Sequence, residues 1–69
     1  MNKGTRISFN SQFQKANGTW EVYNTMGDNV LMARVLKNGT LSTPNAKNLL
    51  VVDMPTLNIA FFVGTAKMA

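Results

Sequence analysis

The chain has 69 residues and a mass of 7.6 kDa, which is enough for one domain near the lower size limit for a core without disulfides or metals. It has no Cys and no His, which excludes disulfides, thiolate chemistry and zinc sites built on these ligands. Seven Lys and Arg against three Asp and Glu give a net charge of +4, yet only 14% of residues are charged, so a polyanionic partner is permitted but not required.

Turn signals divide the chain into short segments and favour an antiparallel all-β fold. They fall at residues 17–18, 27–29, 38–39, 43–45 and 54–55. Two of them are Asn-Gly pairs, which adopt the positive φ angles of tight hairpin turns. Spacing of about ten residues between such signals is typical of a small β domain.

Three strands are expected in the first half of the chain, over Thr5–Gln14, Thr19–Asn24 and Asn29–Lys37. The first places its apolar side chains in phase on one face: Ile7, Phe9 and Phe13. The second directs Trp20 and Val22 toward the core and Glu21 and Tyr23 outward, or the reverse if the register slips by one residue. The first two strands therefore each have one face suited to burial.

Three further strands are expected in the second half, over Thr40–Ser42, Asn48–Asp53 and Leu57–Val63. Pro44 interrupts the ladder, and residues 45–48 are expected to form one helical turn. Residues 64–69 are expected to fray. No longer helix is predicted, because no segment sustains apolar residues at the i, i+3, i+4 and i+7 spacing.

Apolar residues lie on both faces of three of these segments, 30–36, 49–52 and 57–63. Such strands need cover above and below, and a chain this short cannot supply two covering layers. We therefore expect residues 1–69 to form a single all-β domain: a five- to six-stranded antiparallel barrel or strongly bent sheet, SH3-like or OB-like, with little or no helix. The competing architecture is an open sheet covered by a second subunit. An apolar run at an open edge aggregates unless it is paired, which favours closure or dimerisation.

Enzymatic activity is not expected. The only acids are Glu21, Asp28 and Asp53, and without His or Cys the chain offers few groups for acid–base chemistry. We predict no catalytic residues, no metal site and no cofactor.

Nucleic acid, preferably single-stranded, is one expected partner. Phosphates attract cations and unstacked bases attract flat side chains. The residues expected to contact it are Arg6, Lys15, Tyr23, Arg34, Lys37 and Lys47. Arg34 interrupts an apolar strand, so its guanidinium is expected to reach solvent or an anion. The competing interpretation is that the aromatic residues form the core and the lysines keep the protein soluble. For Trp20, the core is the better prediction.

A protein partner is the alternative. The residues expected to form an outward apolar patch are Leu31, Leu50, Val52 and Phe62, with Met32, Leu49, Val51 and Phe61 facing inward. Contiguous apolar patches mark protein partners or self-association. The bends of a small barrel could equally bury both faces without any partner.

Two functions follow from these observations. The first is nucleic-acid binding by a small basic β module, with a homodimer favoured. The second is occlusion of a larger host protein by a small inhibitor or modulator. The size, the nine Asn and seven Thr and the compact β pattern resemble accessory proteins of bacterial viruses. No export signal or membrane span is expected, and the absence of Cys is compatible with the cytoplasm.

Overall fold

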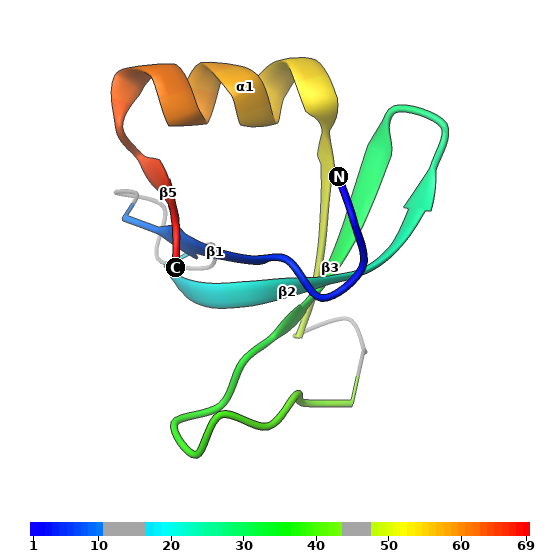
Figure 1. Ribbon diagram of the computed structural model, residues 1–69, viewed down its shortest axis with the longest axis vertical. Helices are drawn as coiled ribbons and strands as arrows, with labels where there is room; N and C mark the ends of the chain where they lie inside the picture. The colour runs from blue at the N-terminus through cyan, green and yellow to red at the C-terminus, as the bar shows by residue number, and fades with distance from the viewer. Residues whose placement is uncertain (11–16, 44–47) are drawn as a thin grey trace.

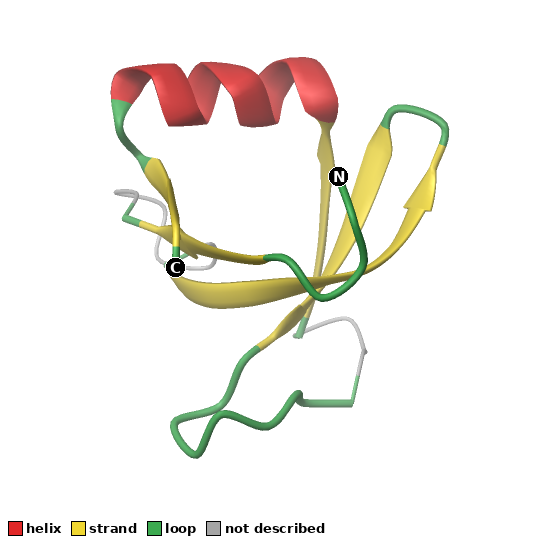
Figure 2. Ribbon diagram, viewed as in Figure 1, coloured by secondary structure: helices red, strands yellow, loops and turns green. Residues whose placement is uncertain are grey.

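Five strands and one helix form the molecule. The computed structural model describes residues 1–10, 17–43 and 48–69. The elements are β1 (Arg6–Phe9), β2 (Gly18–Met26), β3 (Asn29–Arg34), β4 (Leu49–Asp53), α1 (Met54–Val63) and β5 (Ala66–Met68). Figures 1 and 2 show that α1 lies on one side of the strands and connects β4 to β5.

All five strands belong to one antiparallel sheet with the order β4-β3-β2-β1-β5. β4 and β5 are its two edges, so the sheet is not closed. β2 is the central strand and curves through the molecule (Figure 1). Its pairing with β3 shifts between Val22 and Asn24, which makes Tyr23 the extra residue of a β-bulge and increases the local bend. The expectation of a small antiparallel β fold is thus confirmed as an open five-stranded sheet.

The strands expected before residue 54 are confirmed in part. β1, β2, β3 and β4 fall within or close to the predicted segments. The short strand expected over Thr40–Ser42 is reduced to a single bridge between Val35 and Leu41. Phe13 lies outside the described residues, and so do residues 45–47 of the expected helical turn over 45–48.

The strand expected over Leu57–Val63 is wrong, because this segment belongs to α1. Asp53 caps the start of α1: its carboxylate accepts the Thr56 N–H at 3.1 Å and the Thr56 hydroxyl at 2.8 Å. Pro55 occupies the first turn, where its missing N–H costs nothing. At the other end Gly64 adopts the left-handed conformation, and its N–H donates to the Ala60 carbonyl at 3.0 Å. Both ends of the helix are therefore specified locally.

The helix was not predicted because it is apolar on nearly every side. Residues 54–63 contain no charged side chain, so the 3.6-residue alternation that reveals a surface helix is absent. A continuous apolar run can equally form a buried strand, and only the capping residues distinguish the two here. The fraying expected over residues 64–69 is also corrected, because Ala66–Met68 pair with β1 as β5.

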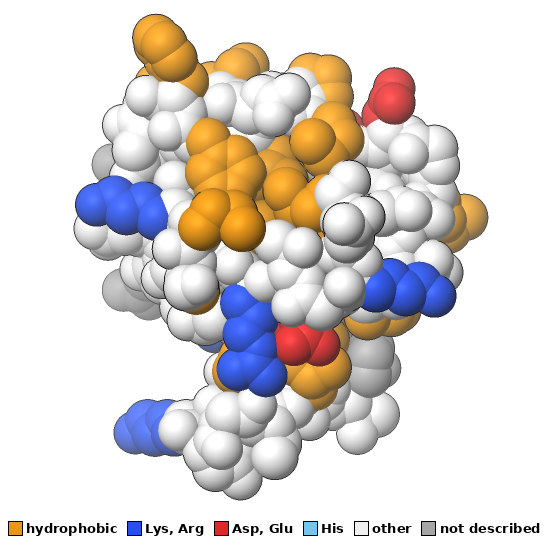
Figure 3. Space-filling model, viewed as in Figure 1, with side chains coloured by type: hydrophobic (Ala, Val, Ile, Leu, Met, Phe, Trp, Pro, Cys, Tyr) orange, Lys and Arg blue, Asp and Glu red, His pale blue; other side chains and the backbone are white. Residues whose placement is uncertain are grey.

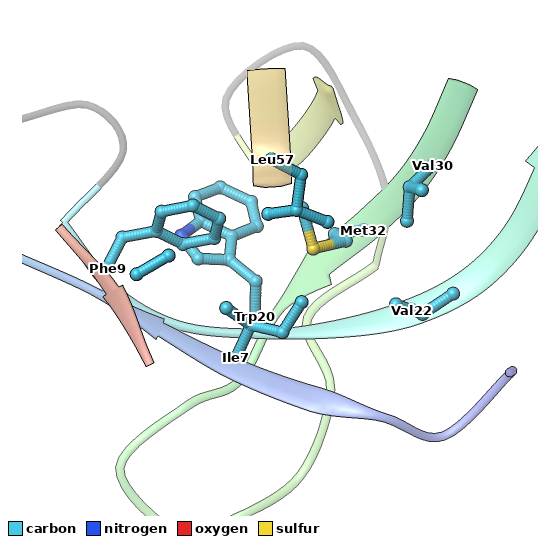
Figure 4. Packing of buried hydrophobic residues seen from close by; sticks show 8 residues of the cluster. Ile7, Phe9, Trp20, Val22, Val30, Met32 and Leu57 are labelled. Atoms are coloured by element: carbon cyan, nitrogen blue, oxygen red, sulfur yellow. The ribbon is translucent and has the colours of Figure 1, made fainter. Parts of the chain in front are cut away.

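The core lies between α1 and the face of the sheet that we call the inner face. Eight buried side chains form it: Ile7, Phe9, Trp20, Val22, Val30, Met32, Leu57 and Ala66. The inward orientation expected for Trp20 and Val22 is confirmed. Figure 4 shows Leu57 directed from α1 toward Trp20 and Met32. Leu57 is the buried residue of α1, so it is the main side chain by which the helix holds the sheet.

We expect Leu57→Ala to lower the free energy of unfolding by about 2–5 kcal/mol, because it leaves a cavity between α1 and the sheet. Urea denaturation followed by Trp20 fluorescence measures the loss. Ile59→Ala is the matched control, since Ile59 lies on the same helix but is exposed, and its effect should stay within about 0.5 kcal/mol. Equal losses in the two variants would contradict this description of the core.

We expect Asp53→Ala to lower the denaturation midpoint more than Asp53→Asn, because Asn also caps helices. Hydrogen bonds from the side chain and backbone of Thr56 lower the pKa of Asp53 below its usual value of 3.8. A lowered folded-state pKa contributes stability above the unfolded-state pKa that is lost as pH falls through the folded-state value. From about pH 5 downward, the wild type should therefore lose more stability than Asp53→Asn. Parallel pH profiles of the two proteins would refute this.

Candidate functional site

The outward side of α1 is the most exposed apolar surface among the described residues. Ile59, Phe62 and Val63 lie opposite Leu57 on the helix, and their exposed fractions are 63%, 92% and 61%. We call these three residues the helix face. They follow the i, i+3 and i+4 spacing, so they form one stripe on the helix surface. An apolar stripe of this kind is normally buried against another structure.

The surroundings of the helix face are also uncharged. α1 has no acidic residue in its first turn and no basic residue in its last. In Figure 3, hydrophobic side chains lie over α1 and gather below it, whereas the Lys and Arg side chains on this side lie at the left and right and lower down, one of them beside an acidic side chain. The helix face is therefore suited to an apolar contact.

The four residues predicted to form an apolar patch do not lie together. Phe62 is exposed on α1 as part of the helix face, and Leu31 is half-buried on the outer face of the sheet. The outward orientation expected for Leu50 and Val52 is wrong. These residues pair with Met32 and Val30, whose side chains are in the core, and directly opposed residues share a face.

The inward orientation expected for Leu49 and Val51 is wrong for the same reason. These two side chains point to the outer face, and Val51 is 53% exposed. A shift of one residue exchanges the two faces of a strand. Since both faces of β4 are apolar, the sequence pattern alone could not decide between them.

Two of the predicted cations line one groove. The groove has a volume of about 540 Å³ and is lined by Arg6, Thr19, Val35, Leu36, Lys37, Gly39 and Ala69. We call it the basic groove. Arg6 already has partners there, because its Nε donates to Glu21 Oε1 at 2.9 Å and its Nη2 donates to the Gly39 carbonyl at 2.9 Å. Lys37 is exposed, and no described residue forms a hydrogen bond or ion pair with its side chain.

Arg34 lies apart from the basic groove and covers the core. Its guanidinium carbon is 4.3 Å from the centroid of the Trp20 ring, and its Nη1 donates to the Asn17 carbonyl at 2.8 Å. A Cβ on Gly18 would approach Nη1 to 2.8 Å, so a glycine at this position leaves room for the guanidinium. Arg34, expected to reach solvent or an anion, is half-buried and makes a cation–π contact and a hydrogen bond within the protein.

Of the remaining residues predicted to bind nucleic acid, the structure describes only Tyr23. Tyr23 is half-buried at the bulge of β2. Lys15 and Lys47 lie outside the described residues. Among the described members of the predicted set, the structure brings only Arg6 and Lys37 into one site.

The acidic side chains have structural partners or stand apart from one another. Glu21 pairs with Arg6, and Asp53 caps α1. Asp28 is exposed in the turn between β2 and β3. The described ranges contain no group of three or more potential metal ligands. In the same part of the chain, no helix is both long enough and apolar enough to span a membrane.

Ile59 and Val63 were missed as site residues. The sequence signal that could have identified them is the pair of helix boundaries: Asp53 and Pro55 mark the start of a helix, and Gly64 marks its end. Once residues 54–63 are placed on a helix, Leu57 and the helix face fall on opposite sides.

The sequence matches no protein-family model, and comparisons with curated proteins and with solved structures found no match. The candidate function therefore depends on the surfaces themselves.

We expect Arg34→Met to lower the free energy of unfolding by about 1–3 kcal/mol, because it removes a charged hydrogen bond and the cation over Trp20. Denaturation monitored by Trp20 fluorescence measures the change, and the emission of the folded state should shift as well. Lys37→Met removes the same charge at an exposed position and should change stability by no more than about 0.5 kcal/mol. Similar effects of the two substitutions would show that Arg34 does not stabilise the core.

Proposed function

We propose that the protein is a non-enzymatic binding module that docks the helix face of α1 into an apolar groove on a larger protein. The observation that carries this proposal is the exposure of Phe62, at 92%, between two further apolar residues on an uncharged helix. Phe62 belongs to the interface predicted from the sequence; Ile59 and Val63 are added by the helical geometry.

The energetics favour burial of the helix face. Removing a large apolar side chain such as Phe, Ile or Val from water contributes about 1.5–3 kcal/mol when burial is complete. Side chains at i, i+3 and i+4 are the anchors by which a short helix binds a hydrophobic groove. Because both ends of α1 are capped, the helix is already ordered and the conformational cost of binding is reduced.

Charge indicates the kind of partner. The chain has a net charge of +4 and α1 contributes none of it, so the helix face is an uncharged surface on a basic protein. An apolar groove with an acidic rim complements this arrangement. Occlusion of such a groove is how a small inhibitor or modulator would act on a host protein.

Several finer expectations remain part of the proposal. The absence of His and Cys, and the structural roles of Glu21 and Asp53, support a function without catalysis. The SH3-like or OB-like likeness remains part of the proposal only as a bent sheet whose edge strands β4 and β5 are joined by α1 and not by strand pairing. The cytoplasmic location rests on the absence of Cys.

Nucleic-acid binding is the second candidate, and the basic groove is the observation that favours it. Arg6 and Lys37 both line this groove, and an exposed Lys suits a phosphate contact. It ranks second because Arg6 is already bonded to Glu21 and Gly39, and because Arg34 is bound over Trp20. Neither cation is as available as the sequence suggested.

The helix face is tested with a photoreactive phenylalanine analogue placed at Phe62 or, as a control, at Tyr23, in cells that express the protein. We expect one protein to be cross-linked from position 62 and not from position 23. The captured protein, once purified, should bind the wild type, and Phe62→Ala should weaken this binding about 30-fold or more, as at an interface hot spot. Salt should weaken this binding far less than it weakens a complex held by phosphate contacts.

The same purified protein separates the alternatives. A labelled single-stranded oligonucleotide provides the first comparison. The nucleic-acid function would replace this proposal if binding falls steeply between about 50 mM and 200 mM salt, is weakened by Lys37→Met and is unchanged by Phe62→Ala. Binding to anionic lipid vesicles that depends on Phe62 would identify a membrane surface instead. Lack of any adduct at position 62 would also overturn the proposal.

A further inference from the structure

β4 is an edge strand without the usual protection against pairing. Natural edge strands carry Lys, Pro or bulges, or are very short. β4 has five residues, of which the first four are Leu49, Leu50, Val51 and Val52. Its pairing with β3 runs without a register shift. β4 is therefore apolar, unbroken by a bulge and able to accept another strand.

The hydrogen-bond pattern shows which main-chain groups of β4 point to the open edge. Arg34 N–H donates to the Asn48 carbonyl, and Met54 N–H donates to the Asp28 carbonyl. Hydrogen-bonded pairs alternate along an antiparallel ladder, so Leu50 and Val52 are directed to β3. The N–H and C=O groups of Leu49 and Val51 therefore point away from the sheet, and no described residue bonds to them.

The opposite edge is different. β5 has three residues, and Lys67 is the central one. A short strand with a Lys at its centre is a protected edge. Head-to-tail pairing of β4 with β5 of another copy is thus disfavoured, whereas β4 is complementary to itself.

We propose that two copies of the chain pair antiparallel along β4, with Val51 opposite Val51 of the second copy. This register overlaps the whole of Leu49–Asp53 and allows the two Val51 residues to exchange main-chain hydrogen bonds. The result is an isologous contact, in which the same surface of each copy forms the interface, so the assembly is a closed dimer. This inference concerns a different surface from the helix face and does not depend on the proposed function.

Side chains on both faces support this pairing. On the outer face, Val51 of each copy meets its equivalent and extends the apolar row that begins at Leu31, its partner on β3. On the inner face, Leu50 of one copy lies opposite Val52 of the other, next to the core. Two residues predicted from the sequence as a protein interface, Leu50 and Val52, thus lie at this contact, and Leu31 lies next to Val51 on the outer face.

Val51→Lys tests the pairing, because it places like charges directly opposite each other at an exposed position. Light scattering during size exclusion, over a range of concentrations, should give a mass of two chains for the wild type. We expect Val51→Lys to raise the dissociation constant about tenfold or more while circular dichroism stays unchanged. Ile59→Lys adds the same charge on α1 and should remain a dimer.

Each other outcome overturns the inference. A wild type with the mass of one chain at every concentration excludes the dimer. Equal effects of the two Lys variants, or a stronger effect of Ile59→Lys, place the contact elsewhere. Species that grow beyond two chains with concentration indicate head-to-tail pairing.

Cysteine cross-linking tests the register independently, since the chain has no native Cys. Directly opposed residues of a hydrogen-bonded antiparallel pair have Cα atoms about 5.5 Å apart, which lies within the usual range of a disulfide. Under mild oxidation, Val51→Cys should form a linked dimer faster than Phe62→Cys, although Phe62 is more exposed. Faster linkage through position 62 would refute pairing along β4.

Discussion

The contact of Leu57 with the inner face of the sheet is the interaction on which the rest of the structure depends. A sheet with apolar residues on both faces needs two covers, and a chain of 69 residues supplies one short helix in its described part. α1 covers the inner face through Leu57, with Phe61 and Ala60 packed beside it. The caps at Asp53 and Gly64 place this helix between β4 and β5, so the local helix signals and the tertiary contact act together.

The surfaces left uncovered follow from the same constraint. The helix buries one side, so Ile59, Phe62 and Val63 remain in solvent on the other. The helix also occupies the connection between the two edge strands, so β4 stays open beside the core instead of pairing with β5. Both surfaces are apolar and free of Lys and Arg. The molecule therefore has two apolar surfaces for association, and we assign one to a partner protein and the other to a second copy of the chain.

Both arginines contribute to the fold. Arg34 lies over Trp20 where β3 ends, and Arg6 connects β1, β2 and the turn at Gly39 through Glu21 and a main-chain carbonyl. A cation that holds a ring or a carbonyl is less available for phosphate than its formal charge suggests. Net charge alone therefore overstated the case for nucleic acid, because the fold uses cations that the sequence presents as free.

The sequence by itself determined the antiparallel β character, the turns at 27–29 and 38–39, the core position of Trp20, and the presence of an apolar strand at 49–53. These follow from local turn chemistry and from alternation, which neighbours along the chain can specify. Only the tertiary structure decided three other features: the conformation of residues 57–63, the face of the sheet on which Leu50 and Val52 lie, and the roles of Arg6 and Arg34. An apolar run fits a strand or a buried helix equally, and a strand that is apolar on both sides has no preferred face. Such choices are made by what each side chain packs against, and that depends on residues distant in the sequence.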